Sequence, residues 1–271
     1  MAELITSAAN PLVKRVRLLA ERKHRRRERA FVVHGIQPVW QAVEAGADID
    51  TLIVAPDLLR HQGAAAMVAA QEAAGQRVAR LSAELFGRIG DRDGPAGLAA
   101  IIRLPATPPG LATVPVHPDS LFAVLHTPGN PGNVGTIIRT ASAAGATAVI
   151  LTGQAADPYD PASVKASMGA LFTTPVVVVP SPAEVFQWAR ERRVRVAATS
   201  ARASQTCWEA ELTPPLAVLL GSEGEGLPGD VLAAADLRVA IPMTGTAESL
   251  NLAVAAGILL YEARRRTGMP G

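Results

Sequence analysis

The chain has 271 residues, of which 49% are hydrophobic and 18% are charged, and its net charge is +2. This composition excludes a disordered chain and allows one large domain or two ordinary ones. A single cysteine, Cys207, excludes an intramolecular disulfide framework and a metal cluster built on several cysteines.

The first hundred residues alternate between helix and strand patterns. Asn10-Pro11 is a helix start signal, and apolar residues then recur at helical spacing with a basic run on the other face. Two further helices are predicted over 38–45 and 64–74, and four short strands over 31–35, 52–54, 78–81 and 98–102. The alternation predicts a small α/β domain.

A proline-rich stretch, residues 104–118, separates the two halves of the chain. Its five prolines are incompatible with a helix and favour an extended linker. We therefore predict an N-terminal domain over residues 1–105, a linker over 106–118 and a C-terminal domain over 119–271.

The second half shows the same alternation with more strongly apolar strands. Strands are predicted over 121–125, 148–151, 176–179, 194–198, 216–220 and 237–241. Helices are predicted over 133–144, 161–171, 182–192, 228–234 and 248–265. Short, fully apolar strands separated by helices predict a parallel sheet that is covered on both faces.

Positive charge is concentrated at the start of the chain. Residues 1–40 carry nine basic and three acidic residues, a net charge of +6, whereas the remainder carries −4. Aromatic residues make up only 4%, so a nucleic acid would be held mainly by arginine and lysine contacts to phosphate. No apolar run is long enough to span a bilayer and the N-terminus lacks a secretory signal, so we expect a cytoplasmic protein without a membrane partner.

Three glycine-rich loops follow predicted strands, at the edge where open α/β sheets bind ligands. The first, residues 127–135, has three glycines and two prolines and precedes a helix. Asn133 is expected to fix geometry from this loop, while Arg139, six residues later and on a different helical stripe, reaches in from the helix. The alternative is a turn followed by a surface arginine.

The other two loops differ from phosphate-binding loops. Residues 221–228 place Glu223 and Glu225 among three glycines, which disfavours the binding of an anion. The loop could bind a cationic or hydroxyl-rich ligand. The alternative is a solvated turn whose acids favour the next helix N-terminus. In residues 241–252, Glu248 or Ser249 is a candidate cap of the last helix. Asn251, one position into that helix, is expected to need a partner.

Several familiar site types are disfavoured. A P-loop requires Gly-Lys-Ser/Thr, which is absent from the sequence. A dinucleotide site requires an acid about 20 residues after the first loop, where strand 148–151 instead ends in Thr-Gly-Gln. The five histidines have no metal-ligand spacing, so no metal is expected, and there is no G-x-S-x-G hydrolase motif.

Taken together, the three loops resemble a known family. Residues 130–141, 219–227 and 241–254 are similar, in order and spacing, to the three signature motifs of the SpoU (TrmH) family, and residues 165–170 also match. That family comprises S-adenosylmethionine-dependent RNA ribose 2′-O-methyltransferases of the SPOUT superfamily. The first hundred residues resemble the substrate-binding domain of its rRNA-modifying members, although a glutamate typical of that domain is replaced by His34. Avilamycin-resistance methyltransferases share this layout.

The resemblance implies a fold, an assembly and a set of site residues. It implies a homodimer, a C-terminal α/β domain with a deep trefoil knot, and S-adenosylmethionine as the cofactor. The implied cofactor-binding residues are Gly221, Ile241, Met243, Gly245 and Leu250. The implied catalytic residues are Asn133, Arg139, Glu223, Ser249 and Asn251.

The resemblance also suggests a role for the acidic residues of loop 221–228. Glu223 suits the sulfonium cation of the cofactor, or it orients Arg139 through a charged pair. The motif-one arginine is often described as the base that takes the ribose 2′-hydroxyl proton. Because arginine is essentially always protonated, we expect Arg139 instead to clamp phosphate and stabilise the developing oxyanion, with a phosphate or water taking the proton.

The predicted substrate is RNA held by the basic N-terminus, and the resemblance to rRNA-modifying members implies that it is ribosomal RNA. The predicted RNA contacts are Lys14, Arg22, Lys23, Arg25, Arg26, Arg27 and Arg29. Neutralising Arg25, Arg26 and Arg27 is expected to weaken RNA binding without changing cofactor affinity. The alternatives are a tRNA methyltransferase, or an inactive RNA-binding protein with the same fold.

Overall fold

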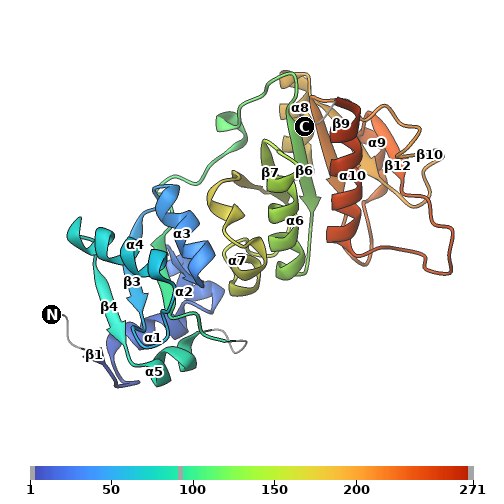
Figure 1. Ribbon diagram of the computed structural model, residues 1–271. Coiled ribbons are helices and arrows are strands. Elements are labelled where there is room, and N and C mark those ends of the chain that lie inside the picture. Colours follow the sequence, from blue (N-terminus) through green and yellow to red (C-terminus); the bar gives the residue numbers. More distant parts are fainter. Residues whose placement is uncertain (1–3, 91–93, 268–271) are drawn as a thin grey trace. The chain divides into compact units, whose positions relative to one another are not determined.

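The computed structural model describes residues 4–90 and 94–267, and the chain forms two compact units (Figure 1). The first comprises Met1–Thr107 with Tyr159–Thr173, and the second comprises Pro108–Pro158 with Thr174–Gly271. The segment Tyr159–Thr173 therefore packs with the first unit, although it lies within the range predicted for the C-terminal domain. The functional division into domains stays a prediction.

The first unit is built on a five-stranded mixed sheet in the order β1-β4-β3-β5-β2, in which β5 runs antiparallel to both neighbours. Its strands are β1 Leu4–Ile5, β2 Ala30–His34, β3 Ile49–Val54, β4 Val78–Leu81 and β5 Leu98–Arg103. Its helices are α1 Pro11–Leu18, α2 Arg22–Glu28, α3 Ile36–Glu44, α4 Gln62–Ala73, α5 Ala83–Ile89 and α7 Pro161–Ser167, followed by the 3-10 turn η2 Ala170–Phe172.

The two faces of this sheet bury separate cores, because successive strand residues point to opposite sides. Val32 and Ile101 pack with α1 and α5 on one face, and Val33 packs with α3, α4 and Val164 of α7 on the other. The predicted small α/β domain is therefore confirmed. Strand β1 and helix α5 lie outside the predicted elements.

The predicted helix over 161–171 is shorter in the structure. Helix α7 ends at Ser167 because Met168 and Gly169 both adopt left-handed backbone angles, with φ of 50° and 93°. A side chain on Gly169 would lie 2.8 Å from Gln41 Cγ, so this close approach of the turn to α3 requires glycine.

The second unit contains a seven-stranded sheet in the order β10-β12-β9-β11-β6-β7-β8, and every pair of neighbours is parallel. Its strands are β6 Leu121–His126, β7 Ala148–Thr152, β8 Val176–Val179, β9 Arg195–Thr199, β10 Gln205–Thr206, β11 Leu216–Leu220 and β12 Leu237–Ala240. Its helices are α6 Pro131–Ala143, α8 Pro182–Arg192, α9 Gly229–Ala234 and α10 Leu252–Thr267, with the 3-10 turn η1 Leu111–Thr113.

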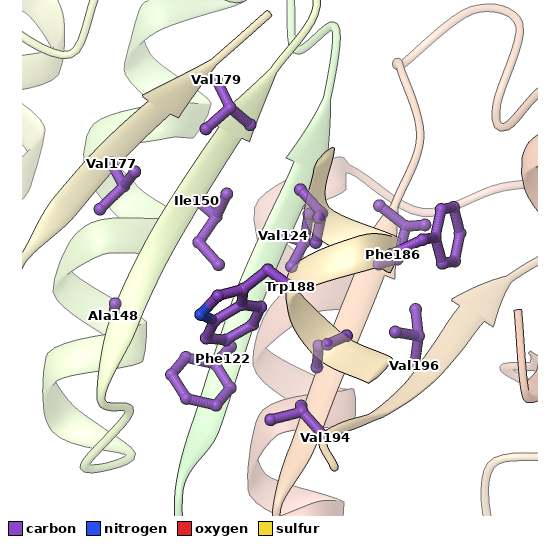
Figure 2. Packing of buried hydrophobic residues seen from close by; sticks show 14 of the residues in the cluster. Phe122, Val124, Ala148, Ile150, Val177, Val179, Phe186, Trp188, Val194 and Val196 are labelled. Atoms are coloured by element: carbon purple, nitrogen blue, oxygen red, sulfur yellow. The ribbon is translucent and has the colours of Figure 1, made fainter. Parts of the chain in front are cut away.

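Helices cover both faces of this sheet, as the apolar strands predict. On one face α8 packs over β6, β7 and β8, and the Trp188 ring meets Phe122 edge-on with ring centroids 5.0 Å apart (Figure 2). On the other face α6 and α10 pack side by side, and α10 also contacts β6 and β11 (Figure 1). The parallel α/β fold is confirmed; the trefoil knot stays a prediction.

The described residues contain no helix that is both long and apolar enough to cross a membrane. The same part of the chain has no group of three or more His, Cys, Asp or Glu side chains that could hold a metal ion.

A carboxylate network joins α1 to the sheet of the first unit. Asp50 on β3 accepts hydrogen bonds from Arg15 Nη1 at 2.7 Å, Arg103 Nη2 at 2.6 Å and Thr51 Oγ1 at 2.9 Å. Burial opposes ionisation of the Asp50 carboxyl, but these three donors outweigh it and hold its pKa below the usual value.

We expect Asp50→Asn to lower the free energy of unfolding by about 2 kcal/mol at pH 7, because it leaves Arg15 without its main partner. Since the folded-state pKa is the lower one, the Asp50 contribution is present above about pH 4 and is lost as the pH falls through the folded-state pKa. Urea unfolding between pH 3 and pH 7 measures both effects. Asp48→Asn is the control, because its exposed carboxylate lies 3.6 Å from Arg103 Nη1 and is expected to contribute little.

Candidate active site

The three glycine-rich loops meet at one edge of the seven-stranded sheet. They follow β6, β11 and β12, and the loop after β9 lies beside them in the strand order. Because all of these strands are parallel, their carboxyl ends lie at the same edge. The structure therefore brings together segments that are about a hundred residues apart in the sequence.

A cavity of about 520 Å³ lies among three of these loops. It is lined by residues of the loops after β9, β11 and β12 and by the first turns of α10. Four of the five predicted cofactor residues line it, namely Gly221, Ile241, Met243 and Leu250. Gly245 belongs to the same loop as Met243 but lies outside the lining.

The loop after β11 forms a lip of the cavity from backbone atoms. Ser222 and Gly226 exchange hydrogen bonds between their N–H and C=O groups at 3.2 and 3.1 Å, which closes the loop on itself. A Cβ atom on Gly221 would lie 2.1 Å from the carbonyl carbon of Gly226. No side chain fits at position 221, so the loop can close on itself in this way only with glycine there.

Glu223 connects this loop to the loop after β6. Its carboxylate accepts hydrogen bonds from the backbone N–H groups of Gly129 at 3.1 Å and Asn130 at 3.3 Å, and from Asn133 Nδ2 at 2.9 Å. Partial burial raises the pKa of Glu223, but these donors more than compensate, so its pKa lies below the usual value. Glu223 is therefore an ionised group that holds the loop after β6 in place.

Asn133 and Asn251 extend this connection to the third loop. Asn251 Nδ2 donates to Asn133 Oδ1 at 3.1 Å, while Asn133 Nδ2 donates to Glu223. One chain of hydrogen bonds thus joins side chains of the loops after β11 and β12 to Asn133, which lies in the first turn of α6 and not in the loop before it. We refer to Glu223, Asn133 and Asn251 as the three-loop network.

Two expectations about these residues were wrong. No ion pair joins Glu223 to Arg139 in the described part of the chain, because Glu223 is directed to Asn133 and the backbone of the first loop. Asn251 does not lie inside the last helix. It caps α10, its Oδ1 accepting from the Ala253 N–H at 2.9 Å, so neither Glu248 nor Ser249 is the cap.

The remaining polar candidates, Ser249 and Arg139, take no part in the hydrogen bonds of the network. Ser249 is exposed and lines the cavity. Arg139 lies on α6, on the helix face that begins with Gly132 and Thr136, and its side chain is exposed. Among the described residues it has neither a hydrogen-bond nor an ion-pair partner. Its guanidinium is therefore available to an anionic substrate.

The cavity has one charged residue that the sequence patterns did not indicate, Arg202. It lines the cavity together with three acidic residues, Glu223, Glu225 and Glu248. Arg202 was missed because the loop after β9 carries no glycine signature. The loop after β9 reaches the cavity because β9 lies beside β11, and this neighbour relation is known only once the strand order is known.

The predicted RNA contacts in the N-terminal segment fall into two groups. Most of the seven are exposed, some of them in surface pairs such as Lys23 with Glu21 and Arg27 with Glu28. Arg29 is also exposed, and its guanidinium donates to the carbonyls of Pro105 and Ala106.

Arg25 is the exception and is withdrawn from the predicted RNA contacts. It is only 2% exposed. Its Nη1 donates to the carbonyls of Leu19 at 3.1 Å and Ala20 at 2.7 Å, and its Nη2 lies 3.3 Å from Asp160, which caps α7. Arg25 thus joins the turn after α1 to α7 inside the first unit.

We expect Arg25→Gln and Arg26→Gln to have different effects. Loss of the buried Arg25 charge is expected to cost on the order of 3 kcal/mol of unfolding free energy. Arg26→Gln is expected to leave stability unchanged and to reduce the slope of log K for RNA against log salt by about one. Thermal unfolding and filter binding at several salt concentrations separate the two effects, with the exposed Arg60→Gln as control. Equal loss of stability in both variants would contradict the assignment.

Comparisons with known proteins agree with this arrangement. The SpoU rRNA Methylase family matches residues 120–261, and the MRM3-like substrate binding domain matches residues 10–100. A 23S rRNA (uridine(2479)-2′-O)-methyltransferase of Streptomyces viridochromogenes is 36% identical over 92% of this chain and 87% of its own length. A 23S rRNA (guanosine(2553)-2′-O)-methyltransferase of Bacillus subtilis is 29% identical over 96% of this chain and 98% of its own length. The crystal structure of an AdoMet-bound rRNA methyltransferase from Sinorhizobium meliloti covers 99% of both chains, with 34% identity and a TM-score of 0.88. The chain therefore belongs to the SpoU rRNA methylase family.

Proposed function

We propose that this protein transfers a methyl group from S-adenosylmethionine to the 2′-hydroxyl of a ribose in ribosomal RNA. The observation that carries the proposal is the three-loop network, which sits beside the 520 Å³ cavity in a chain of this family. The network fixes three polar side chains before any substrate binds, and such preorganisation is what a displacement reaction requires.

The residues around the cavity fit the proposed cofactor. Its volume is within the range of small-molecule sites, and one edge of it is a tightly closed backbone loop in which a side chain at position 221 would collide with Gly226. Its carboxylates suit a ligand that carries a sulfonium and an ammonium group and no phosphate. Gly221, Ile241, Met243 and Leu250 would hold the cofactor, with Gly245 in the adjoining loop. When bound, S-adenosylmethionine supplies an electrophilic methyl group.

Arg139 and Asn133 have separate proposed roles at the reacting ribose. Long side chains on helices extend toward the helix N-terminus, so Arg139 is expected to reach over Thr136 toward the first turn of α6, which carries Asn133. There it would clamp a substrate phosphate and stabilise the oxygen as the 2′-hydroxyl loses its proton. Asn133, held by Glu223 and Asn251, would orient the ribose, with Ser249 nearby. The proton passes to a phosphate or to water, because arginine stays protonated.

Ribosomal RNA is favoured over tRNA as the substrate. The two relatives described above match more than nine-tenths of this chain, including its first unit, and both carry 23S rRNA in their names. The exposed basic residues of α1 and α2 would contact RNA phosphates, and we expect Lys14, Arg22, Lys23, Arg26, Arg27 and Arg29 to contribute. We place the protein in the cytoplasm, where such a substrate is available.

We also infer that two copies of the chain associate through α10. Val254 and Tyr261 are seven residues apart on this helix, and their exposed fractions are 51% and 41%. An exposed apolar stripe on a helix of the second unit is typical of a contact with another protein surface. We expect light scattering to give twice the chain mass at micromolar concentration, and Val254→Glu with Tyr261→Glu to shift it to one chain mass. A single chain mass for the unchanged protein would contradict the homodimer.

The proposed reaction is tested with labelled cofactor and unmodified 23S rRNA. We expect label to enter the RNA, and nuclease mapping to place it in an alkali-resistant 2′-O-methyl nucleotide. Label on a base, or acceptance by tRNA alone, would replace this proposal. Calorimetry that detects no S-adenosylmethionine binding would favour an inactive RNA-binding protein.

A further inference from the structure

Arg202 lines the cavity of about 520 Å³ in the second unit, and the function proposed above gives it no role. It follows β9, outside the three glycine-rich loops. Hydrogen bonds within its own turn fix its backbone, because the Arg202 N–H donates to Ser200 Oγ at 3.2 Å and the Ala203 N–H donates to the Ser200 carbonyl at 3.1 Å. Since β9 lies between β11 and β12 in the sheet, this turn lies between the other two loops that line the cavity.

Arg202 is the single basic residue among the described residues that line this cavity, and three acidic residues, Glu223, Glu225 and Glu248, line it as well. Its side chain is exposed, and in the part of the chain that the structure describes its guanidinium has neither a hydrogen-bond nor an ion-pair partner. The Glu223 carboxylate accepts its hydrogen bonds from the loop after β6 and from Asn133. Arg202 therefore gives the cavity a guanidinium that forms no ion pair with these carboxylates.

The proposed cofactor carries charges of both signs. S-adenosylmethionine has a sulfonium and an ammonium group, which the carboxylates of the lining attract, and a carboxylate, which they repel. Placing an ionised carboxylate in a cavity without a partner is costly, so this part of the cofactor requires a cation beside it. A guanidinium suits a carboxylate well, because it donates two parallel N–H bonds to the two oxygens.

We propose that Arg202 binds the carboxylate of S-adenosylmethionine and makes the site select a cofactor that carries this group. The inference rests on the proposed function and adds to it a residue that determines cofactor specificity. Without Arg202, the acidic lining would favour decarboxylated S-adenosylmethionine, which keeps both cationic groups and lacks the anionic one. Arg202 reverses that preference.

Calorimetry with the two forms of the cofactor, in the absence of RNA, tests this assignment. We expect the unchanged protein to bind S-adenosylmethionine more tightly than the decarboxylated form. Arg202→Gln should weaken S-adenosylmethionine binding by about tenfold, the typical effect of losing a hydrogen bond between charged groups, and should not weaken binding of the decarboxylated form. Arg238→Gln is the matched control, because Arg238 is an exposed arginine of β12 outside the cavity lining, and this variant should bind both ligands normally.

Arg202→Glu separates a contact with the carboxylate from a structural role of the side chain. The reversed charge repels the carboxylate and attracts the cationic groups. Affinity for S-adenosylmethionine should therefore fall by more than about tenfold, while affinity for the decarboxylated form should rise by roughly threefold. Damage to the loop after β9 would instead weaken the binding of both ligands.

Three other results would overturn the assignment. Equal losses for the two ligands in Arg202→Gln, or no loss for either, would show that Arg202 does not bind the carboxylate, and the proposed reaction would be unaffected. Normal binding of both ligands with weaker binding of 23S rRNA would show that the guanidinium contacts RNA phosphate. If the unchanged protein binds no S-adenosylmethionine, the proposed function is wrong and the role of Arg202 falls with it.

Discussion

Arg139→Ala is expected to reduce methyl transfer to rRNA by at least about a hundredfold, the typical effect of removing one group that stabilises charge in a transition state. Arg139 is exposed, and it lies outside the lining of the 520 Å³ cavity. Cofactor affinity should therefore change little. Single-turnover methylation and calorimetry with S-adenosylmethionine measure the two effects separately.

Arg190 offers a matched control for this substitution. It is an exposed arginine on α8, on the opposite face of the same sheet, and Arg190→Ala should retain full activity. If Arg139→Ala keeps the normal rate, the role proposed for its guanidinium is wrong. If the variant instead loses its cooperative unfolding transition, Arg139 serves the fold and not the reaction.

Gly221→Ala is expected to weaken S-adenosylmethionine binding by about tenfold or more. The added Cβ would lie 2.1 Å from the carbonyl carbon of Gly226 and 2.5 Å from the Leu227 nitrogen, and both are backbone atoms. The loop after β11 must therefore move, and overpacking of this kind typically costs about 1–3 kcal/mol. Since Glu223 follows two residues later, the three-loop network is displaced as well, and kcat should fall with affinity.

Gly229→Ala provides the comparison, because a Cβ at this position at the start of α9 meets no atom within 4 Å. Calorimetry on both variants, with thermal unfolding as a check of folding, makes the test. An unchanged cofactor affinity in Gly221→Ala would show that the backbone lip is not part of the binding site.

The sequence indicated the site through patterns that are local. Each glycine-rich loop is recognisable beside an apolar strand, and parallel strands end at one edge of a sheet. Asn133, Glu223 and Asn251 were therefore expected near one another, and their hydrogen bonds place them so. The family resemblance rests on the same three segments.

Local patterns failed where a long-range contact decided the outcome. Arg25 belongs to a basic run and was expected to face RNA, but a carboxylate 135 residues away and two nearby carbonyls bury it. Arg139 was one of the partners expected for Glu223, but the Glu223 carboxylate instead accepts hydrogen bonds from backbone N–H groups of the loop after β6. The positions of these residues in the sequence do not indicate which distant groups they contact.

The sequence by itself determined the alternation of helices and strands, the parallel sheet and the three loops, because hydrophobic periodicity and glycine positions act over a few residues. Only the tertiary structure decided the strand order that adds Arg202 to the cavity, the transfer of Tyr159–Thr173 to the first unit, and the cap that starts α10 at Asn251. These features depend on which distant groups form hydrogen bonds with each buried polar or charged atom, and those partners come together only when the whole chain is packed.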